Sequence, residues 1–517
     1  MSKLNFNQVQ KIKSTPQIRF NAAKTVAKPT ARTENNAVAY NTTGHKLSDF
    51  FSRFGAMRSS SEQEILATFQ DLYEVMPQEA VKLLMFFRDC RGGEGERRVF
   101  DVVYNWFIKT DNPLAYQLLT FVPEVGYWKD VRDSMVYAAT VRNLAFLDFA
   151  CAIFVGQLYT DTKAKNMSLA AKYAPTENWA RKNDTHEQVF KRFMLAVREI
   201  LKIEDRQEYR KLISLMRSTL NVVETQMSAQ RWESIDFAAV PSKAHNLYRK
   251  AFGKHQQTRY AEYLAKLVKG ETKINASVLT PFDIAKKYLT PTGRVFGYDE
   301  TLEQLWKALP NYVQHDVLAI SDTSSSMDGD PMLMSVALGV YFAQRSTGAF
   351  KNEVVSFNSN PEFIDLSKCK TLHEAFTAMS KISWGGSTNL HKAFEKLLQT
   401  AVRNKATNED LPKFLIILSD MQMDRACGQV PFDAIRKDFA KHNFSVPTTI
   451  FWNLRASESK NFPVANGDNV IEVSGCSPAV LQFVLSTISG NSLQVIYDII
   501  NNPRYAFVDS LEVWGSE

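Results

Sequence analysis

The stretch Asp316-Val317-Leu318-Ala319-Ile320-Ser321-Asp322-Thr323-Ser324-Ser325-Ser326-Met327 joins a short apolar run to a polar loop. The run has the length and composition of a buried strand of a parallel sheet. In open α/β sheets, ligands bind beyond the carboxyl ends of the strands, where Asp322, Ser324 and Ser326 are expected. One carboxylate and two hydroxyls at alternate positions offer oxygen ligands to a hard cation. Taken alone, such a loop is more often a serine-rich turn that caps the next helix.

From His315 onward, strand patterns alternate with helical patterns. This alternation predicts a doubly wound, mostly parallel sheet, and about 200 residues are enough for one such domain. The predicted strands are Val317–Ile320, Glu353–Phe357, Phe414–Leu418, Thr448–Trp452 and Val470–Val473, and the predicted helices lie near Pro331–Gln344, Leu372–Met379, Leu390–Val402, Phe432–His442 and Pro478–Ser486.

Two later loops offer further oxygen atoms to the same edge of the predicted sheet. Thr388, in Trp384-Gly385-Gly386-Ser387-Thr388-Asn389, supplies a hydroxyl near the start of a helix, and Asp420 follows a buried strand. Asp322 and Asp420 are expected at the same edge of the sheet, where two carboxylates repel each other unless a cation or a proton neutralises them. The sequence therefore predicts a divalent-cation site, with Mg²⁺ first and Mn²⁺ or Ca²⁺ as alternatives. Its predicted ligands are Asp322, Ser324, Ser326, Thr388 and Asp420.

Between Lys46 and about Asn311 the pattern is helical throughout, as in 189–201, where apolar residues recur every three to four positions. Many helices without strands predict stacked antiparallel helix pairs, that is, a HEAT-like helical-repeat body, although no fixed period is visible. We therefore expect three parts: a disordered basic arm over 1–45, a helical-repeat domain over 46–311 and the α/β domain over 312–517.

Charge is distributed unevenly along the 517 residues. Residues 315–517 hold 17 Lys and Arg against 22 Asp and Glu, a net charge of −5, whereas subtraction from the totals of 62 and 55 leaves 45 against 33, a net charge of +12, in residues 1–314. A basic region of this kind fits a polyanionic partner such as nucleic acid, or equally a helical domain with a basic surface. The first 45 residues carry seven Lys or Arg before Tyr40, which fits a phosphate-binding arm better than a transit peptide.

The cysteines indicate a reducing compartment. Cys90, Cys151, Cys369, Cys427 and Cys476 are odd in number, scattered and never in a CxxC pair, so a cytoplasmic location is expected. The sequence shows neither a secretory signal nor a charge-free apolar run of about 18 residues, and no membrane partner is expected.

Several basic residues lie beside aromatic rings or glycines in the helical half. The loop from Arg88 to Arg98 fits internal salt bridges or phosphate contacts, and it lacks the closing Lys-Ser/Thr of a nucleotide P-loop. Lysines next to Tyr127, Trp128 and Tyr173 fit the stacking and charge that hold single-stranded RNA, or buried rings with solvated lysines. The candidate RNA-binding residues are Arg88, Arg91, Lys129, Lys172, Arg181, Lys254, His255 and Arg259.

The five predicted ligands together resemble the metal-ion-dependent adhesion site (MIDAS) of a von Willebrand factor A domain. The helical region that leads through 278–284 into 317–322 resembles the TROVE module that precedes such a domain in the Ro autoantigen family. An uncharacterised TROVE-like branch of plants, microbes and viruses is more similar still, and the match covers about 46–500. The motifs that carry this second resemblance are Tyr209-Arg210-Lys211, Trp232-Glu233-Ser234-Ile235, Val240-Pro241-Ser242, Leu267-Val268-Lys269-Gly270, Phe451-Trp452-Asn453-Leu454-Arg455 and Val473-Ser474-Gly475-Cys476-Ser477-Pro478.

The resemblance implies a ring of helical repeats closed by the von Willebrand factor A domain. Single-stranded or misfolded RNA ends would enter the ring, and small structured RNAs would bind its basic outer face, giving a non-catalytic ribonucleoprotein. Ser325 stands where relatives often have glycine, which would stiffen the loop without removing a ligand. The alternative is a protein–protein adhesion module, in which a partner's carboxylate completes the cation's coordination without RNA. A metal-dependent phosphate hydrolase is disfavoured, because no base or second metal cluster is evident.

Overall fold

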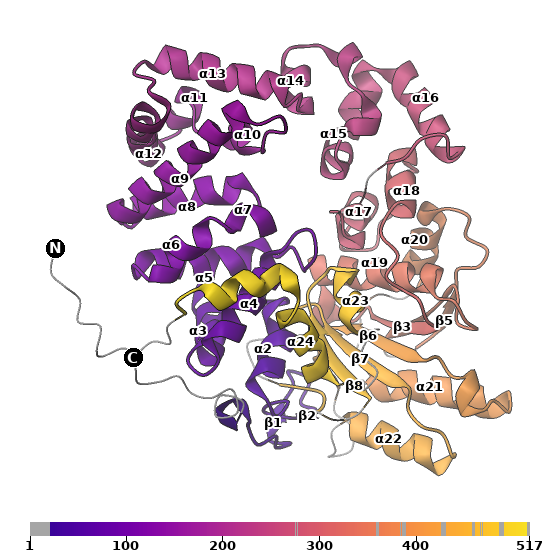
Figure 1. Ribbon diagram of the computed structural model, residues 1–517. Helices are drawn as coiled ribbons and strands as arrows, with labels where there is room; N and C mark the ends of the chain where they lie inside the picture. The colour runs from indigo at the N-terminus through magenta and orange to yellow at the C-terminus, as the bar shows by residue number, and fades with distance from the viewer. Residues whose placement is uncertain are drawn as a thin grey trace.

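The fold was analysed in a computed structural model that describes residues 21–274, 276, 278–357, 361–382, 384, 389–424, 431–456, 461–465, 467, 469–484 and 491–513. A helical body is followed by an α/β domain with a six-stranded sheet (Figure 1). The helices of the body are α2 (Lys46–Phe54), α3 (Glu62–Tyr73), α4 (Pro77–Arg88), α5 (Arg97–Lys109), α6 (Pro113–Leu119), α7 (Val122–Val125), α8 (Trp128–Thr140), α9 (Leu144–Lys163), α10 (Ala170–Tyr173), α11 (Glu177–Ala180), α12 (Asp184–Ala196), α13 (Arg206–Thr219), α14 (Val223–Ser228), α15 (Ser242–His255), α16 (Gln257–Val268), α17 (Pro281–Tyr288) and α18 (Glu300–Lys307).

Local sequence signals start several of these helices. Ser61 and Glu64 form a reciprocal capping box at α3, and Thr280 and Asp283 form another at α17. Proline occupies the first turn of α4, where its missing N–H costs nothing. These caps explain why the helical prediction for this half of the chain holds.

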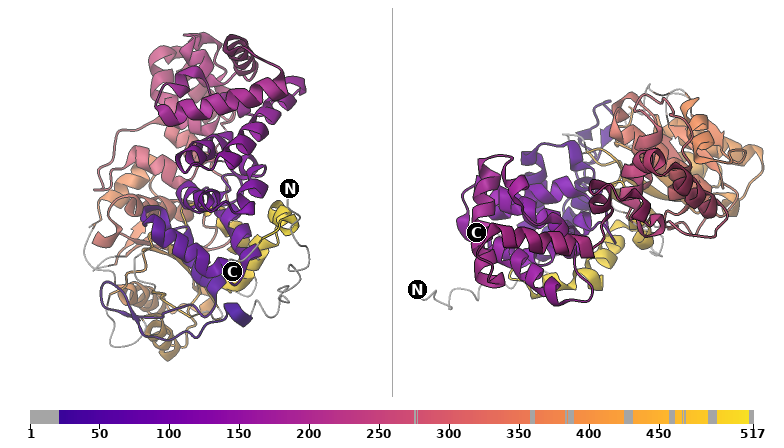
Figure 2. Two further views of the ribbon diagram at one scale, coloured as in Figure 1. Left: turned by 90° about the vertical axis from the view of Figure 1, so that its left-hand side faces the viewer. Right: turned by 90° about the horizontal axis from the view of Figure 1, so that it is seen from above.

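The helical body follows an arc that leaves the α/β domain and returns to it (Figures 1 and 2). From α2 the helices lead up to α12 and α13, and then back through α15 to α18. At one end of the arc α2 packs on β8 and α24, and at the other end α17 packs on α19. The HEAT-like repeat and a closed ring stay predictions.

The α/β domain has strand order β5-β4-β3-β6-β7-β8, and β5 alone is antiparallel to its neighbour. The predicted mixture of a helical region and a mostly parallel α/β region is confirmed. The short edge strand β5, α24 and η9 were not predicted. The elements are β3 (Val317–Asp322), η6 (Ser325–Met327), α19 (Asp330–Arg345), β4 (Glu353–Phe357), β5 (Phe363–Asp365), α20 (Leu372–Ser380), α21 (Leu390–Arg403), η7 (Asn408–Asp410), β6 (Phe414–Ser419), α22 (Pro431–Lys441), β7 (Thr448–Asn453), β8 (Val470–Ser474), η8 (Pro478–Val480), α23 (Leu481–Val484), α24 (Ser492–Ile500) and η9 (Pro503–Ser510).

The segment before α2 differs from the disordered arm expected over 1–45. From residue 21 it is structured, and β1 (Ala31–Arg32) pairs with β2 (Val38–Ala39) as a small antiparallel ribbon. Tyr40 forms an antiparallel bridge with Phe462 and donates a hydrogen bond to the Asp433 carboxylate (3.1 Å). The low hydrophobicity of this segment suggested disorder, but its backbone and polar side chains find partners on the α/β domain.

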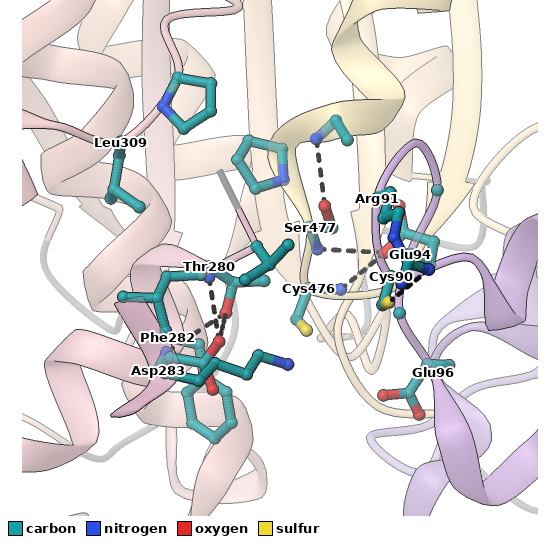
Figure 3. Close-up of a pocket in the computed structure, with 18 of the residues that line it drawn as sticks. Cys90, Arg91, Glu94, Glu96, Thr280, Phe282, Asp283, Leu309, Cys476 and Ser477 are labelled. Carbon is teal, nitrogen blue, oxygen red and sulfur yellow. Dashed lines mark hydrogen bonds between the residues drawn. The ribbon is translucent and has the colours of Figure 1, made fainter. Parts of the chain in front are cut away.

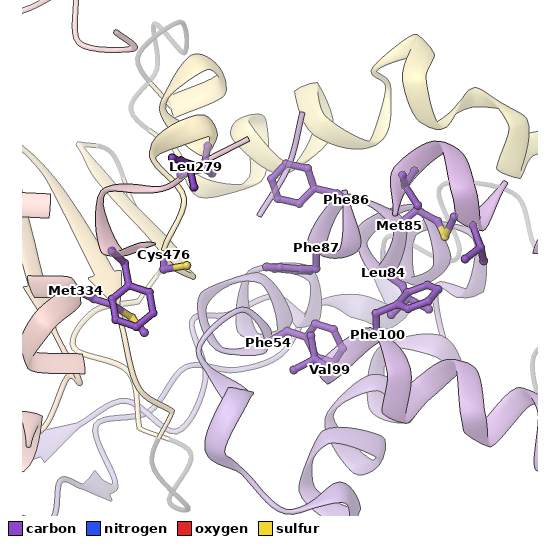
Figure 4. Packing of buried hydrophobic residues seen from close by; sticks show 14 of the residues in the cluster. Phe54, Leu84, Met85, Phe86, Phe87, Val99, Phe100, Leu279, Met334 and Cys476 are labelled. Atoms are coloured by element: carbon purple, nitrogen blue, oxygen red, sulfur yellow. The ribbon is translucent and has the colours of Figure 1, made fainter. Parts of the chain in front are cut away.

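The two sides of the sheet belong to different cores. Val317 and Ala319 face the core that continues into the helical body, whereas Leu318 and Ile320 face α21 and α22, as the alternation of a strand requires. Where the halves meet, Phe54, Phe86 and Phe87 of the helical body lie beside Cys476 of the α/β domain (Figure 4). The helical body and the α/β domain therefore share one apolar core.

Among the described residues, α9 is long and apolar enough to cross a membrane by length and composition, although the sequence predicted no such helix. Its side chains Phe146, Ala150, Phe154 and Leu158 are buried, and the helix packs on α8 and α12. This arrangement is the packing of a core helix.

Candidate metal centre and nucleic-acid interface

Asp322 and Asp420 lie at the carboxyl edge of the sheet on neighbouring strands. Asp322 ends β3, Asp420 follows β6, and the two strands are paired in parallel with Ser321 opposite Leu418. Both carboxylates are buried, with exposed fractions of 0% and 3%. Strand pairing therefore brings together two acids that are 98 positions apart in the sequence.

Hydroxyl and backbone groups surround the two carboxylates. The N–H of Ser324 donates to Asp322 Oδ1 (2.9 Å), and the hydroxyl oxygens of Ser324 and Ser326 lie 3.1 Å apart. Ser326 also hydrogen-bonds the Asp420 carboxylate. Four of the five predicted ligands thus lie together, while Thr388 lies outside the described residues.

The electrostatics of this group favour a cation. Burial, and then the charge of Asp420, raise the pKa of Asp322 to about 7. Burial also raises the pKa of Asp420. Two buried carboxylates that resist ionisation are stabilised by a positive charge between them, and carboxylate and hydroxyl oxygens suit a hard divalent ion. The residues present therefore fit a divalent cation.

Three residues of this site were not predicted. The Ser419 hydroxyl donates to Asp322 Oδ2 (2.5 Å), and Arg455 Nη1 donates to the Ser326 carbonyl (2.8 Å). Ser419 ends a stretch with a predicted strand pattern, and Arg455 belongs to one of the motifs that carry the family resemblance, but neither pattern signals this role. The third residue, Glu34, lines a cavity of about 500 Å³ together with Ser326 and Asp420, and no local pattern points to it.

The candidate RNA-binding residues at the start of the helical body have different surroundings. The prediction that Arg88 binds RNA is wrong. Its side chain is 1% exposed and forms a buried ion pair with Asp130, so it cannot reach RNA. Arg91 is exposed, donates to the Glu124 carbonyl (2.8 Å) and lies 5.9 Å from the ring centre of Tyr127. Lys129 pairs with Asp133 (2.5 Å). Of these, Arg91 keeps an exposed position beside an aromatic ring.

Lys172 and Arg181 lie in one groove of about 910 Å³ formed by α10 to α14, which we call the basic groove. Its five basic side chains outnumber its two acidic side chains, Glu177 and Glu224. Lys172 pairs with Glu224 (2.9 Å). Arg181 and Arg210 are exposed and make no side-chain ion pair among the described residues. The other basic side chains of the groove are Arg206 and Arg217.

Two of the three remaining candidates, His255 and Arg259, contact the loop that contains Trp232. The His255 ring stacks on the Trp232 ring with centroids 4.0 Å apart, and Arg259 donates to the Ile235 carbonyl (3.0 Å). Lys254 is exposed. His255 and Arg259 thus have local packing roles, and RNA contact at this cluster stays a prediction.

A separate cavity of about 220 Å³ lies between the loop after α4, the start of α17 and the loop after β8 (Figure 3). Its wall contains Cys90, Glu94 and Asp283. Glu94 Oε2 accepts hydrogen bonds from the backbone N–H groups of Cys476 and Ser477 (3.1 and 3.0 Å). Burial raises the pKa of Glu94 to about 8. This carboxyl group joins the helical body to the α/β domain.

Comparison with known families divides the chain at the same seam. Residues 153–315 match the family model described as "Domain of unknown function (DUF2828)", and residues 316–497 match "Domain of unknown function (DUF7788)". The chain is 27% identical over 529 aligned positions to "Uncharacterized protein L728" of Acanthamoeba polyphaga mimivirus, covering 93% of this chain and 90% of the relative. A viral relative of nearly full length agrees with the expected resemblance to a branch that includes viruses.

Two solved structures are similar to the chain at low sequence identity. The Deinococcus radiodurans RO (RSR) protein is 13% identical, with a TM-score of 0.38, and the match covers 86% of this chain and 93% of that protein. Proximal thread matrix protein 1 from the mussel byssus, solved with a zinc-occupied MIDAS motif, is 17% identical, with a TM-score of 0.25. That match covers 34% of this chain and 46% of the mussel protein, so the chain spans less than half of the mussel protein's length.

Proposed function

We propose that this protein is a non-catalytic RNA-binding protein, similar to Ro ribonucleoproteins, whose von Willebrand factor A-like domain holds a divalent cation, most simply Mg²⁺. The single observation that carries RNA binding is the basic groove, where Arg181 and Arg210 present charge without acidic partners in the part of the chain that the structure describes. The expected ligand is single-stranded or misfolded RNA, or a small structured RNA, because exposed guanidinium groups bind phosphates in any sequence.

A second basic cluster supports the same proposal. The charged ends of Arg91 and Lys243 each lie 5.9 Å from the ring centre of Tyr127, although they come from distant parts of the arc. An aromatic ring flanked by cations suits a stacked base with its phosphate. The four described free cysteines, Cys90, Cys151, Cys369 and Cys476, are compatible with the proposed cytoplasmic location.

The cation is assigned to Asp322, Ser324, Ser326 and Asp420, and Thr388 remains part of the proposed set. A bound divalent ion would supply positive charge that neutralises the two buried carboxylates. The alternative function, in which a partner protein's carboxylate reaches the cation, is disfavoured by the cavity walls. Glu34, Ser59 and Glu64 of the same chain already line the cavity in front of Asp420.

RNA binding is tested with the variant R181A/R210A. We expect the full-length protein to bind a fluorescent single-stranded RNA of 20 nucleotides at low salt, and the variant to bind about tenfold more weakly. Loss of two phosphate contacts should reduce the slope of log affinity against log salt by about 1.4. Fluorescence anisotropy over a salt series measures both quantities.

The matched control is K396A/R403A, which removes two exposed charges from α21 on the acidic domain. We expect its affinity and salt slope to equal those of the parent protein. No RNA binding by the parent protein at low salt would contradict the proposed function. Equal losses in both variants would show that overall charge, rather than the basic groove, governs binding.

A further inference from the structure

The segment over residues 31–39, which we call the N-terminal strap, is tied to the loop that follows Asp420. The Glu34 N–H donates to Gln422 Oε1 (2.7 Å), and Asn35 Nδ2 donates to the Gln422 carbonyl (2.8 Å). On the other side of Glu34, the Thr33 hydroxyl donates to the Met423 carbonyl (2.7 Å). Contacts from three consecutive residues fix the strap beside the candidate cation site.

The cavity in front of that site is built from five separate parts of the chain. The strap contributes Glu34, the start of α3 contributes Ser61 and Glu64, and the loop after β7 contributes Arg455. Ser326 and Asp420 form the remaining wall. The cation's outward side therefore faces a partly open cavity that is lined by other side chains of the same chain.

Two polar groups of this cavity lack partners among the described residues. The Gln422 residue is only 2% exposed, and its amide Nε2 has no hydrogen-bond partner among the described residues. No described group bonds the Glu34 carboxylate, whereas the Glu64 carboxylate accepts from the Ser61 N–H and hydroxyl (2.9 and 2.8 Å). A buried unpaired amide indicates that a ligand or ordered water belongs in the cavity.

The Glu34 side chain lines the same cavity as Asp420, and its backbone N–H is bonded to Gln422, two positions after Asp420. The basic side chain of this cavity, Arg455, donates through Nη1 to the Ser326 carbonyl. A third carboxylate beside two buried ones is unfavourable unless a cation joins them.

We propose that Glu34 is a further ligand of the cation, so that the chain completes its own MIDAS-like site with an internal carboxylate. This inference rests on the cation site assigned under the proposed function. A carboxylate from the strap takes the position that a partner's acidic residue would otherwise fill. Because the strap precedes the helical body, the bound cation joins the N-terminal segment to the α/β domain.

The test uses Mn²⁺ alone as the probe with the full-length protein and the variants E34Q, E64Q and D322A. Electron paramagnetic resonance of free Mn²⁺ gives the affinity, and water-proton relaxation reports the water on the bound ion. We expect E34Q to bind Mn²⁺ about tenfold more weakly, as loss of one supporting carboxylate does at other sites. Its bound ion should also relax water faster, because water replaces the lost carboxylate.

E64Q is the matched control, because it neutralises a second glutamate of the same cavity and a glutamine preserves the capping box of α3. We expect E64Q to match the parent protein and D322A to lose Mn²⁺ binding. Parent-like affinity and relaxation in E34Q would overturn the role of Glu34 while leaving the cation site intact. Absence of Mn²⁺ binding to the parent protein would overturn the cation site, and the Glu34 inference with it.

Discussion

Glu94 shows how one buried carboxyl group joins the two halves of the molecule. Its Oε2 accepts backbone N–H groups of Cys476 and Ser477, and Glu96 lies close enough to raise its pKa beyond the effect of burial. Arg58 pairs with Glu96 (2.9 Å) and moderates this repulsion. The charged form of Glu94 is therefore disfavoured in the folded protein, while the unfolded chain ionises it near its ordinary pKa of 4.5.

This difference predicts a pH dependence of stability at Glu94. Between about pH 4.5 and 8 the folded state binds more protons at this group than the unfolded state, so its contribution to the unfolding free energy falls as pH rises. The variant E94Q keeps an acceptor oxygen but cannot ionise. In urea unfolding, we expect the unfolding free energy of E94Q, relative to that of the parent protein, to rise by about 1 kcal/mol per pH unit across this window. Parallel pH profiles for the two proteins would contradict the prediction.

Helix α4 carries the apolar contact between the helical body and the α/β domain. The Phe87 ring meets the rings of Phe54 and Phe50 edge to face, with centroids 5.3 and 6.0 Å apart. Phe86 makes a similar contact with Phe483 of α23 (6.1 Å). One helix thus packs against α2 and against the C-terminal elements.

Truncation of Phe87 should destabilise the whole molecule. The side chain is fully buried, so F87A leaves a cavity and should lower the unfolding free energy by about 3 to 5 kcal/mol. The control F149A removes a phenylalanine on α9 that is 36% exposed, and it should lower the unfolding free energy markedly less than F87A does. Denaturant titration followed by circular dichroism measures both values. Equal losses at the two positions would refute the central role assigned to this junction.

At the scale of the whole molecule, the C-terminal elements are attached to the end of helix α4 in the helical body. Arg504 of η9 forms an ion pair with the buried Asp89, and the Tyr505 hydroxyl donates to Asp89 Oδ2 (3.0 Å). The apolar core also continues from the helical body into one face of the sheet. The helical body therefore has no core of its own, although the α/β domain has a second core on the other face of its sheet.

This shared core predicts that the two halves unfold together. We expect a single calorimetric transition that coincides with the loss of near- and far-ultraviolet circular dichroism. The variant D89A should shift this single transition to lower temperature, because it leaves the Arg504 charge without its partner. Two separate transitions, with D89A affecting one of them, would indicate independently folding domains.

The sequence by itself determined the five parallel strands of the large sheet, most helices and the meeting of Asp322 with Asp420. Each of these follows from a local period, a capping residue or the rule that parallel strands end at one edge. Lys172 and Arg181 were also singled out, but their shared groove was not, because it needs the packing of α10 to α14. The closed ring and its RNA remain proposals.

Only the tertiary structure decided the surroundings of Arg88, Glu34 and Asp89. Arg88 looks like a phosphate ligand beside its glycines, yet Asp130, 42 positions later, buries it. Glu34 meets Gln422 across 388 positions, and Arg504 meets Asp89 across 415. Contacts across such separations leave no periodic trace in either segment, since each depends on how the helical arc returns to the sheet. The strap and the C-terminal elements can make these contacts only when the helical arc has packed back against the α/β domain.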